Sequence, residues 1–202
     1  MIAIIDYGVG NLFSLRSSFR EIGAEAVVTS DEKVIAEADR IILPGVGAFE
    51  DAARKLRESG MAEVVRREAA AGKPMMGICL GMQLLFDVGY EYGKHDGLGL
   101  ISGSVCPISD VIPSDYKIPH IGWNLLRFKR ESPLFKYIKE GDYVYFVHSY
   151  YAAECDGSVI AVTEYGAELT AAVANGNVYG CQFHPEKSGD VGMNILKAFV
   201  EL

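Results

Sequence analysis

A cysteine flanked by glycines stands between two apolar stretches. Residues 75–85 read MMGICLGMQLL, which places Cys79 in the pattern G-x-C-x-G. This spacing is typical of a nucleophile elbow, where a strand turns sharply into a helix and the turn residue has a strained backbone. The backbone segments on either side of such a turn approach closely, which favours glycine at positions 77 and 81. The helix N-terminus favours the thiolate form of the cysteine, and the N–H of Leu80 can donate to a developing oxyanion. A buried structural thiol beside a glycine turn is the alternative.

A histidine and a glutamate occur two positions apart near the C-terminus. Residues 182–187 read QFHPEK. In an extended strand His184 and Glu186 would point to the same side, and Pro185 favours an extended conformation for His184. The glutamate can then hold one imidazole nitrogen while the other faces a thiol, as in a Cys-His-carboxylate triad. An exposed ion pair, which contributes little, is the alternative.

A glycine-rich loop follows an apolar run earlier in the chain. Residues 43–49 read LPGVGAF, with Gly45 and Gly47 on either side of Val46. Such a loop lets the backbone approach a ligand closely, and could supply a second oxyanion donor or hold an amino-acid substrate. A plain strand-to-helix turn would have the same composition.

The composition excludes several classes of protein. The chain has 202 residues, a formal net charge of -8 and a sequence pI of about 5.0. It lacks the basic footprint of nucleic-acid-binding proteins, and it contains neither an apolar run of about 20 residues nor a signal peptide. We therefore expect a cytoplasmic protein that binds no nucleic acid and no membrane. The four cysteines form no C-x-x-C pair, so no zinc site or disulfide framework is expected.

Strand-like and helical patterns alternate through the first half of the chain. Short apolar runs predict strands over 1–5, 26–29, 40–43 and 74–79. Amphipathic stretches predict helices over 12–22, 31–38 (with Asp31 as N-cap), 48–71 (broken at Gly60) and 81–88. This order predicts a parallel sheet with helices on both faces.

The second half is richer in β-branched and aromatic residues. It predicts strands over 98–105, 120–128, 142–151 and 159–165, then a hairpin over 169–183 around Asn175-Gly176, and a last helix over 192–200. We expect one α/β domain over residues 1–202, with antiparallel strands added to a parallel core in a mixed sheet.

The motifs PGVGAF, GICLGMQLLF and QFHPEKS, in this order, resemble those of the class I (triad) glutamine amidotransferases over nearly the whole chain. The resemblance implies a three-layer, flavodoxin-like α/β fold, with L-glutamine as substrate and no metal or organic cofactor. Cys79 would attack the glutamine side chain, and the thioester would be hydrolysed to glutamate after ammonia leaves. The matching positions imply His184 as acid/base, Glu186 as its partner, and an oxyanion or substrate site formed by Val46, Gly47, Leu80, Gln83, Ser149 and Tyr150.

Within that family, PGVGAF, PHIGWN and YFVHSYY resemble segments of the glutaminase subunits of imidazole glycerol phosphate synthase, a histidine-biosynthetic enzyme. The resemblance implies a heterodimer with a (β/α)8-barrel cyclase that receives the ammonia, and weak activity of the chain alone. It also implies a partner interface at His120, Trp123 and Asn124, and Lys187, next to the triad, either reaches the same partner or only solvates a loop. If Trp123 packs in the core, that interface assignment fails.

Three other functions remain open from the sequence. A glutaminase serving a different synthase would use the same chemistry with another partner. A cysteine peptidase or esterase could carry a similar elbow, and a non-enzymatic interaction module could have descended from the fold.

Overall fold

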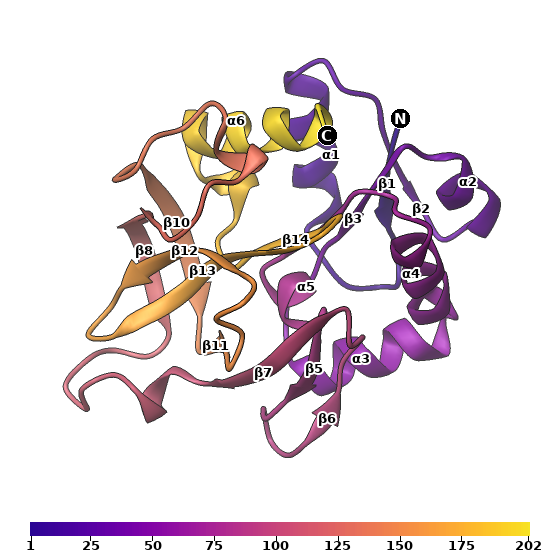
Figure 1. Cartoon of the computed structure of the whole chain (residues 1–202). Helices are drawn as coiled ribbons and strands as arrows, with labels where there is room; N and C mark the ends of the chain where they lie inside the picture. Colours follow the sequence, from indigo (N-terminus) through magenta and orange to yellow (C-terminus); the bar gives the residue numbers. More distant parts are fainter.

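The computed structural model describes residues 1–202, and an eight-stranded sheet runs through its centre (Figure 1). The strand order is β2-β1-β3-β4-β14-β13-β12-β9. Its parallel part consists of β1 (Ile2–Ile5), β2 (Ala26–Thr29), β3 (Arg40–Leu43), β4 (Met75–Ile78) and β14 (Val178–Cys181). The antiparallel strands β13 (Glu168–Asn175), β12 (Val159–Glu164) and β9 (Arg127–Phe128) extend it. The expected parallel core with antiparallel additions is therefore confirmed.

Helices cover both faces of this sheet, which confirms the predicted α/β class (Figure 1). One face carries α1 (Leu12–Glu21) and α6 (Gly189–Val200). The other carries α2 (Glu32–Glu37), α3 (Phe49–Glu58) and α4 (Met61–Ala70). None of the helices has the length and apolar composition needed to cross a bilayer.

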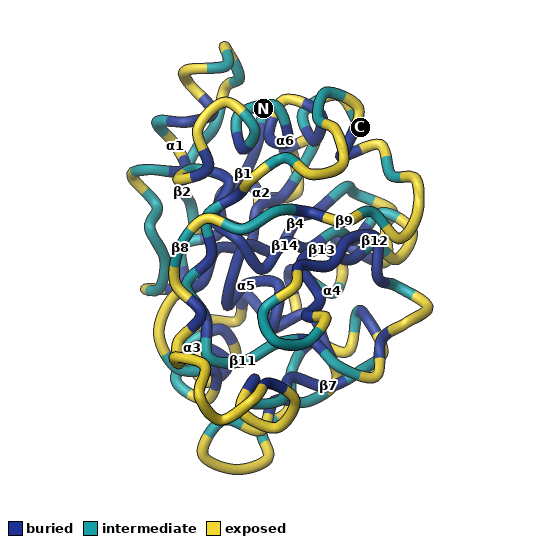
Figure 2. The backbone as a smooth tube through the Cα atoms, turned by 90° about the vertical axis from the view of Figure 1, so that its left-hand side faces the viewer, coloured by how far each residue is buried: buried dark blue, intermediate teal, exposed yellow.

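Strand β1 shows why the sheet needs helices on both sides. Its four residues are all buried, and Ile2 and Ile4 join the core under α1 and α6, whereas Ala3 and Ile5 join the core under α3 and α4. Successive side chains of a strand point to opposite faces, so a continuous apolar run is stable only between two layers. Each fully buried isoleucine contributes about 1.5–3 kcal/mol. Figure 2 shows that β4 and most of β14 are also buried, in the middle of the molecule.

The strands of the second half do not all join the central sheet, so that part of the prediction was wrong. A four-stranded sheet has the order β11-β7-β5-β6. It contains β5 (Phe86–Gly89), β6 (His95–Asp96), β7 (Ile101–Pro107) and β11 (Tyr150–Ala153). The strands β8 (His120–Leu125) and β10 (Tyr143–His148) form a separate antiparallel pair. The two small sheets lie against opposite cores, which the sequence pattern alone does not specify.

The helix predicted over 81–88 is also wrong beyond its first turn. Helix α5 spans only Leu80–Gln83, and β5 begins at Phe86 and pairs in parallel with β7. An apolar run such as LLF fits a buried strand as well as a buried helix. Tertiary hydrogen bonds decide the outcome, because Leu98 and Leu100 donate their N–H groups to the carbonyls of Leu84 and Leu85.

Local signals set several boundaries correctly. The Asp31 side chain accepts a hydrogen bond from the Lys33 N–H at 2.8 Å, as expected of an N-cap. Gly60, with φ +77°, separates α3 from α4. The hairpin turn lies one residue later than predicted, because Asn175 pairs with Val178 and leaves Gly176-Asn177 as the loop. Gly176 has φ +59°, consistent with a glycine-first type II′ turn.

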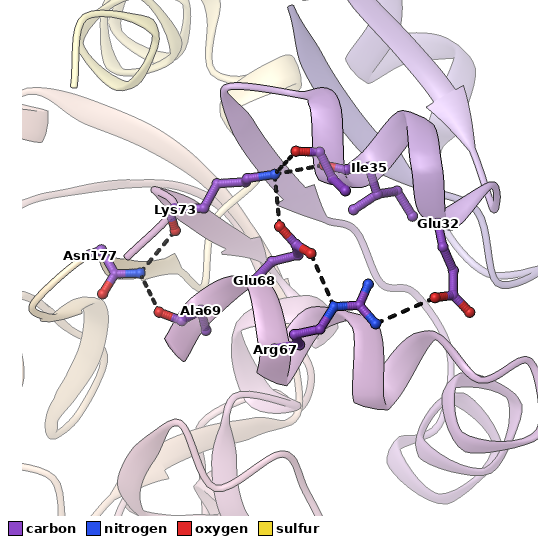
Figure 3. Close-up of polar contacts among 8 residues, drawn as sticks. Glu32, Ile35, Arg67, Glu68, Ala69, Lys73 and Asn177 are labelled. Carbon is purple, nitrogen blue, oxygen red and sulfur yellow. Dashed lines mark hydrogen bonds and ion pairs between the residues drawn. The ribbon is translucent and has the colours of Figure 1, made fainter. Parts of the chain in front are cut away.

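A partly buried lysine, Lys73, links α2, α4 and the segment before β4 (Figure 3). The Lys73 ammonium donates to the Ile35 and Ala36 carbonyls at the end of α2, both at 2.8 Å, and pairs with Glu68 of α4 at 2.8 Å. Hydrogen bonding to Lys73 lowers the pKa of Glu68. The Asn177 amide, in the hairpin turn, donates to the carbonyls of Lys73 and Ala69. These contacts fix the chain as it enters β4.

Candidate active site

Cys79 lies in the sharp turn between β4 and α5, with φ 55° and ψ -114°. A positive φ is strained for a non-glycine residue, and the surrounding packing must maintain it. A Cβ on Gly81 would lie 1.9 Å from the Leu43 carbonyl oxygen, and one on Gly77 would lie 2.6 Å from the Gly81 oxygen. The strained turn and the close approach predicted from G-x-C-x-G are both confirmed.

The electrostatic part of that prediction needs a correction. Because α5 is a single turn, it aligns few peptide dipoles and provides little of the field that a long helix gives. What remains is a set of individual donors. As the first helical residue, Leu80 has an N–H without an intrahelical acceptor, adjacent to the cysteine.

The PGVG loop packs directly on this turn. A Cβ on Gly45 would lie 2.4 Å from the Gly81 nitrogen, so the loop backbone contacts the start of α5. Gly47 has φ +93°, which glycine adopts without strain. The buried Tyr7 hydroxyl, just after β1, donates to the Pro44 carbonyl at 2.7 Å and anchors the loop. Backbone N–H groups from two segments can therefore converge beside the sulfur.

His184 and Glu186 meet as predicted, although not in a strand. Strand β14 ends at Cys181, and Pro185–Lys187 form a 3-10 turn (η3). The proline permits this turn because it occupies the first helical position, where its missing N–H costs nothing. His184 Nδ1 donates to Glu186 Oε1 at 2.8 Å, and both side chains are almost completely buried. The other imidazole nitrogen is left for Cys79.

The pKa of His184 reflects this pairing. Burial lowers it, but hydrogen bonds and charge from Cys79 and Glu186 outweigh burial and raise the pKa of His184 to about 9. A charged imidazolium is thus the favoured state of His184 at neutral pH. A positive charge beside the Cys79 sulfur favours the thiolate form that nucleophilic attack requires.

Two residues outside the triad fix the backbone of His184. Its N–H donates to the Tyr145 carbonyl of β10 at 2.9 Å, and the Ser188 hydroxyl donates to the His184 carbonyl at 2.6 Å. The Ser188 oxygen also accepts the Tyr145 N–H at 3.0 Å. Strand β10 therefore positions the histidine, a role that only tertiary structure reveals.

A cavity of about 280 Å³ opens over Cys79. Of the predicted catalytic and substrate-binding residues, only Glu186 is not in its wall, because it lies behind His184. The wall contains Val46, Gly47, Cys79, Leu80, Gln83, Ser149, Tyr150 and His184, together with Glu91, Pro119, Val147 and His148, which sequence reasoning missed. The size suits a ligand as small as an amino acid. No group of three or more metal-ligating side chains occurs.

Two polar residues of the wall have definite orientations. Glu91 Oε2 accepts the Phe49 N–H at the start of α3, at 2.7 Å, which holds the carboxylate in place. Gln83 Nε2 donates to the Tyr150 carbonyl at 3.2 Å and to Gln182 Oε1 at 2.9 Å. Both amide hydrogens of Gln83 are thus used within the protein, which leaves its Oε1 as the atom that can bind a ligand. No sequence signal distinguished Glu91 from other loop acids.

The residues predicted to contact a partner divide into two groups. Trp123 and Lys187 are exposed, with Trp123 54% accessible, whereas Asn124 is partly buried. Trp123 packs edge-on against Tyr145 and Lys187 lies over the same ring, so the two flank one surface. His120 is only 2% accessible and lies beneath this surface, stacked on Phe146. Its side chain does not reach a partner, because neighbouring rings cover it.

Known proteins match the chain along its whole length. The family model "Glutamine amidotransferase class-I" matches residues 3–202. A Caldanaerobacter subterraneus protein named imidazole glycerol phosphate synthase subunit HisH is 51% identical, covering 100% of this chain and 98% of its own. A Lactococcus lactis protein of the same name is 49% identical, covering 99% and 98%.

Solved structures agree in fold. One described as a glutamine amidotransferase has a TM-score of 0.77 at 18% identity, covering 100% of this chain and 98% of that one. PurLQS from Thermotoga maritima has a TM-score of 0.75 at 23% identity, covering 99% and 97%. With its motifs, cavity and full-length matches, the chain belongs to the class I glutamine amidotransferase family.

Proposed function

We propose that this chain is the glutaminase subunit of an imidazole glycerol phosphate synthase and hydrolyses L-glutamine to glutamate and ammonia. The observation that carries the chemistry is the Cys79–His184–Glu186 arrangement, with its sulfur in a cavity of amino-acid size. The specific synthase is suggested by the printed name of relatives about half identical to this chain over nearly its full length.

Glutamine would bind with its side-chain amide over Cys79. Glu91 is the one carboxylate in the cavity wall and suits the α-ammonium group. The free oxygen of Gln83 can accept a further N–H from the substrate. The Tyr150 carbonyl already accepts hydrogen bonds from Gln83 and His148, so substrate contacts at this point fall to other atoms of Ser149 and Tyr150.

The reaction then follows from the protonation state of the pair. The Cys79 thiolate attacks the amide carbon, and the Leu80 N–H with a donor from the Val46–Gly47 loop stabilises the oxyanion; loss of one such donor typically costs about 10²–10³ in rate. The His184 imidazolium protonates the departing ammonia. The neutral imidazole then takes a proton from water, which hydrolyses the thioester. Glu186 stabilises the imidazolium throughout.

The ammonia would pass to a (β/α)8-barrel cyclase, which forms imidazole glycerol phosphate and AICAR from the phosphoribulosyl-formimino-AICAR nucleotide. Trp123 and Lys187 supply the contact surface, because they are exposed and close to the catalytic segment, and the partly buried Asn124 lies at its edge. Large aromatic side chains are frequent anchors of such interfaces. The expected cytoplasmic location remains a prediction.

The test is to measure glutamate and ammonia release from glutamine by the purified chain. The reaction is measured with the chain alone, then with the cyclase, and then with the cyclase and its nucleotide substrate, each time beside a Cys79→Ala control. We expect strong stimulation by the loaded cyclase that the control lacks. Cys79-dependent hydrolysis that ignores the cyclase would point to another synthase. Hydrolysis absent under every condition would contradict the proposal.

A further inference from the structure

Gln182 lies against the nucleophile but has no place in the triad mechanism. Its side chain is completely buried, and its Nε2 donates to the Cys79 sulfur at 3.8 Å. Its backbone N–H is separately held by the Ala171 carbonyl. A buried amide with its N–H on a sulfur is favourable only if the orientation is fixed, because the carbonyl end would repel a thiolate.

Gln83 fixes that orientation. Its Nε2 donates to Gln182 Oε1 at 2.9 Å, so the Gln182 oxygen faces Gln83 and its nitrogen faces the sulfur. Gln83 in turn cannot rotate its own amide, because the same Nε2 donates to the Tyr150 carbonyl, which can only accept. The direction of both amides therefore follows from one backbone carbonyl.

Two buried histidines hold that carbonyl from the other side. His148 Nδ1 must carry a proton, because it lies 2.8 Å from the Tyr150 carbonyl oxygen. Its Nε2 then accepts from His120 Nδ1 at 2.9 Å, and His120 Nε2 accepts from the Asn124 amide at 3.3 Å. The second Asn124 hydrogen goes to the Glu164 carbonyl at 2.8 Å. Every donor meets an acceptor only if both imidazoles are neutral.

The surroundings keep them neutral. His120 is stacked between Phe146 and Tyr165, with centroids 4.9 Å and 4.1 Å away. Burial lowers the pKa of both His120 and His148 to about 4. We use the name polar chain for the linked groups Asn124, His120, His148, the Tyr150 carbonyl and Gln83.

We propose that Gln182 is a further catalytic residue, a hydrogen-bond donor to the Cys79 sulfur, and that the polar chain positions its amide from strand β8. The N–H stabilises the attacking thiolate and restricts where the sulfur points. His148 and His120 are positioning residues, since they act through the Tyr150 carbonyl. The proposal rests on Cys79 as nucleophile, but not on the identity of the synthase.

The test of the donor uses Gln182→Met, which keeps the length of the side chain and removes the N–H. Alkylation of Cys79 by iodoacetamide at fixed pH, followed on the Cys79 peptide by mass spectrometry, needs neither glutamine nor partner. We expect the alkylation rate to fall about tenfold, the low end for a bond to a charged group, with a similar fall in kcat for glutamine. An unchanged alkylation rate would overturn the donor role.

The test of the polar chain compares two replacements of His148. His148→Asn places an amide nitrogen near Nδ1 and keeps the bond to Tyr150, whereas His148→Gln reaches the Nε2 position and loses that bond. We expect Cys79 to be alkylated in His148→Asn at a rate within about threefold of that in the native chain. In His148→Gln we expect the alkylation rate to fall about tenfold, as in Gln182→Met, which corresponds to about 1.4 kcal/mol.

A double-variant cycle separates positioning from general damage. In the Gln182→Met background, His148→Gln should have no further effect on alkylation, because its route to the sulfur is already removed. Effects that multiply would overturn the polar chain. Should a variant fail to fold by circular dichroism, NMR decides: the Gln182 side-chain amide resonances should shift in Cys79→Ala, and unshifted resonances would overturn the donor role.

Discussion

The three buried histidines of this chain have pKa values that are shifted in opposite directions. The pKa of His184 is raised to about 9, whereas burial lowers the pKa of His120 and His148 to about 4. His184 faces Glu186 and the Cys79 sulfur, whose negative charge compensates its burial. The other two face each other, a carbonyl and aromatic rings, so no negative charge compensates a positive charge there, and the bond to the Tyr150 carbonyl does not outweigh burial. All three histidines are buried, so the presence or absence of a negatively charged partner decides which of them is protonated at neutral pH.

This difference predicts a maximum of stability near neutral pH. Below about pH 6.5 a histidine in the unfolded chain becomes protonated, whereas folded His120 and His148 stay neutral down to about pH 4. In that range the free energy of unfolding should therefore fall by about 1.4 kcal/mol per pH unit for each of the two histidines. His184 has the opposite sign: its stabilisation is complete below about pH 6.5 and is lost as the pH rises through about 9.

Urea unfolding between pH 5 and 9 checks this prediction. His148→Asn, which removes one of the two neutral histidines, should reduce the loss of stability between pH 6.5 and 5. The same acid slope in the native chain and in this variant would contradict it.

Removal of the charge behind His184 should reduce turnover without affecting binding. Glu186 lies outside the cavity wall, so Glu186→Gln should lower kcat for glutamine by about 10²–10⁴-fold and leave KM nearly unchanged. The expectation follows because the amide can still orient the imidazole but no longer stabilises its charge. Steady-state ammonia release measures both constants, with the exposed Glu131→Gln as control. A kcat within threefold of native would contradict the role of Glu186.

Individual elements depend on contacts that reach them from elsewhere. The segment entering β4 is fixed by Lys73, which joins the end of α2 to α4. Lys73→Met should lower the free energy of unfolding by about 2 kcal/mol, because it removes two hydrogen bonds to the Ile35 and Ala36 carbonyls and leaves the Glu68 carboxylate with Arg67 as its only partner. The exposed Lys33→Met, on the same helix α2, is the matched control. Thermal unfolding should show a fall of roughly 4–8 °C in Tm, and equal Tm values for the two variants would contradict the prediction.

Prediction from sequence succeeded where the signal was local. Asp31, Gly60 and the glycines around Cys79 act through their own backbone or immediate neighbours, so α2, the α3–α4 break and the elbow could be anticipated. Residues 86–89 form a strand because distant N–H groups satisfy their carbonyls, and no periodicity reports that. Glu91 and His148 reach the cavity through the arrangement of the smaller sheets, so they were missed.

The whole molecule brings its three motifs together by strand order. The PGVG loop follows β3, Cys79 follows β4 and His184 follows the end of β14, and these three parallel strands are neighbours in the sheet. Loops at the carboxyl ends of adjacent parallel strands meet at one edge, where α/β proteins bind their ligands. Residues more than 100 positions apart in sequence thus form one site, as the motif order predicts once the sheet is parallel.

The outer surface allows a test of assembly at the same scale. Trp123→Ala should weaken binding of the cyclase by about 2 kcal/mol, or about 30-fold in Kd, since a large exposed aromatic is a frequent anchor. Isothermal titration measures the affinity, and Tyr92→Ala, a still more exposed aromatic between β5 and β6, is the control. Unchanged affinity with an intact fold would remove Trp123 from the interface.

Trp123 has one more consequence, because it is the only tryptophan of the chain and its indole is in contact with water. The tryptophan fluorescence of the protein therefore reports on a single part of its surface. Any molecule that covers this part should move the emission to shorter wavelength and protect it from quenching by acrylamide. The emission of Trp123 thus reports the binding of any molecule beside Tyr145 and Lys187 without an added label.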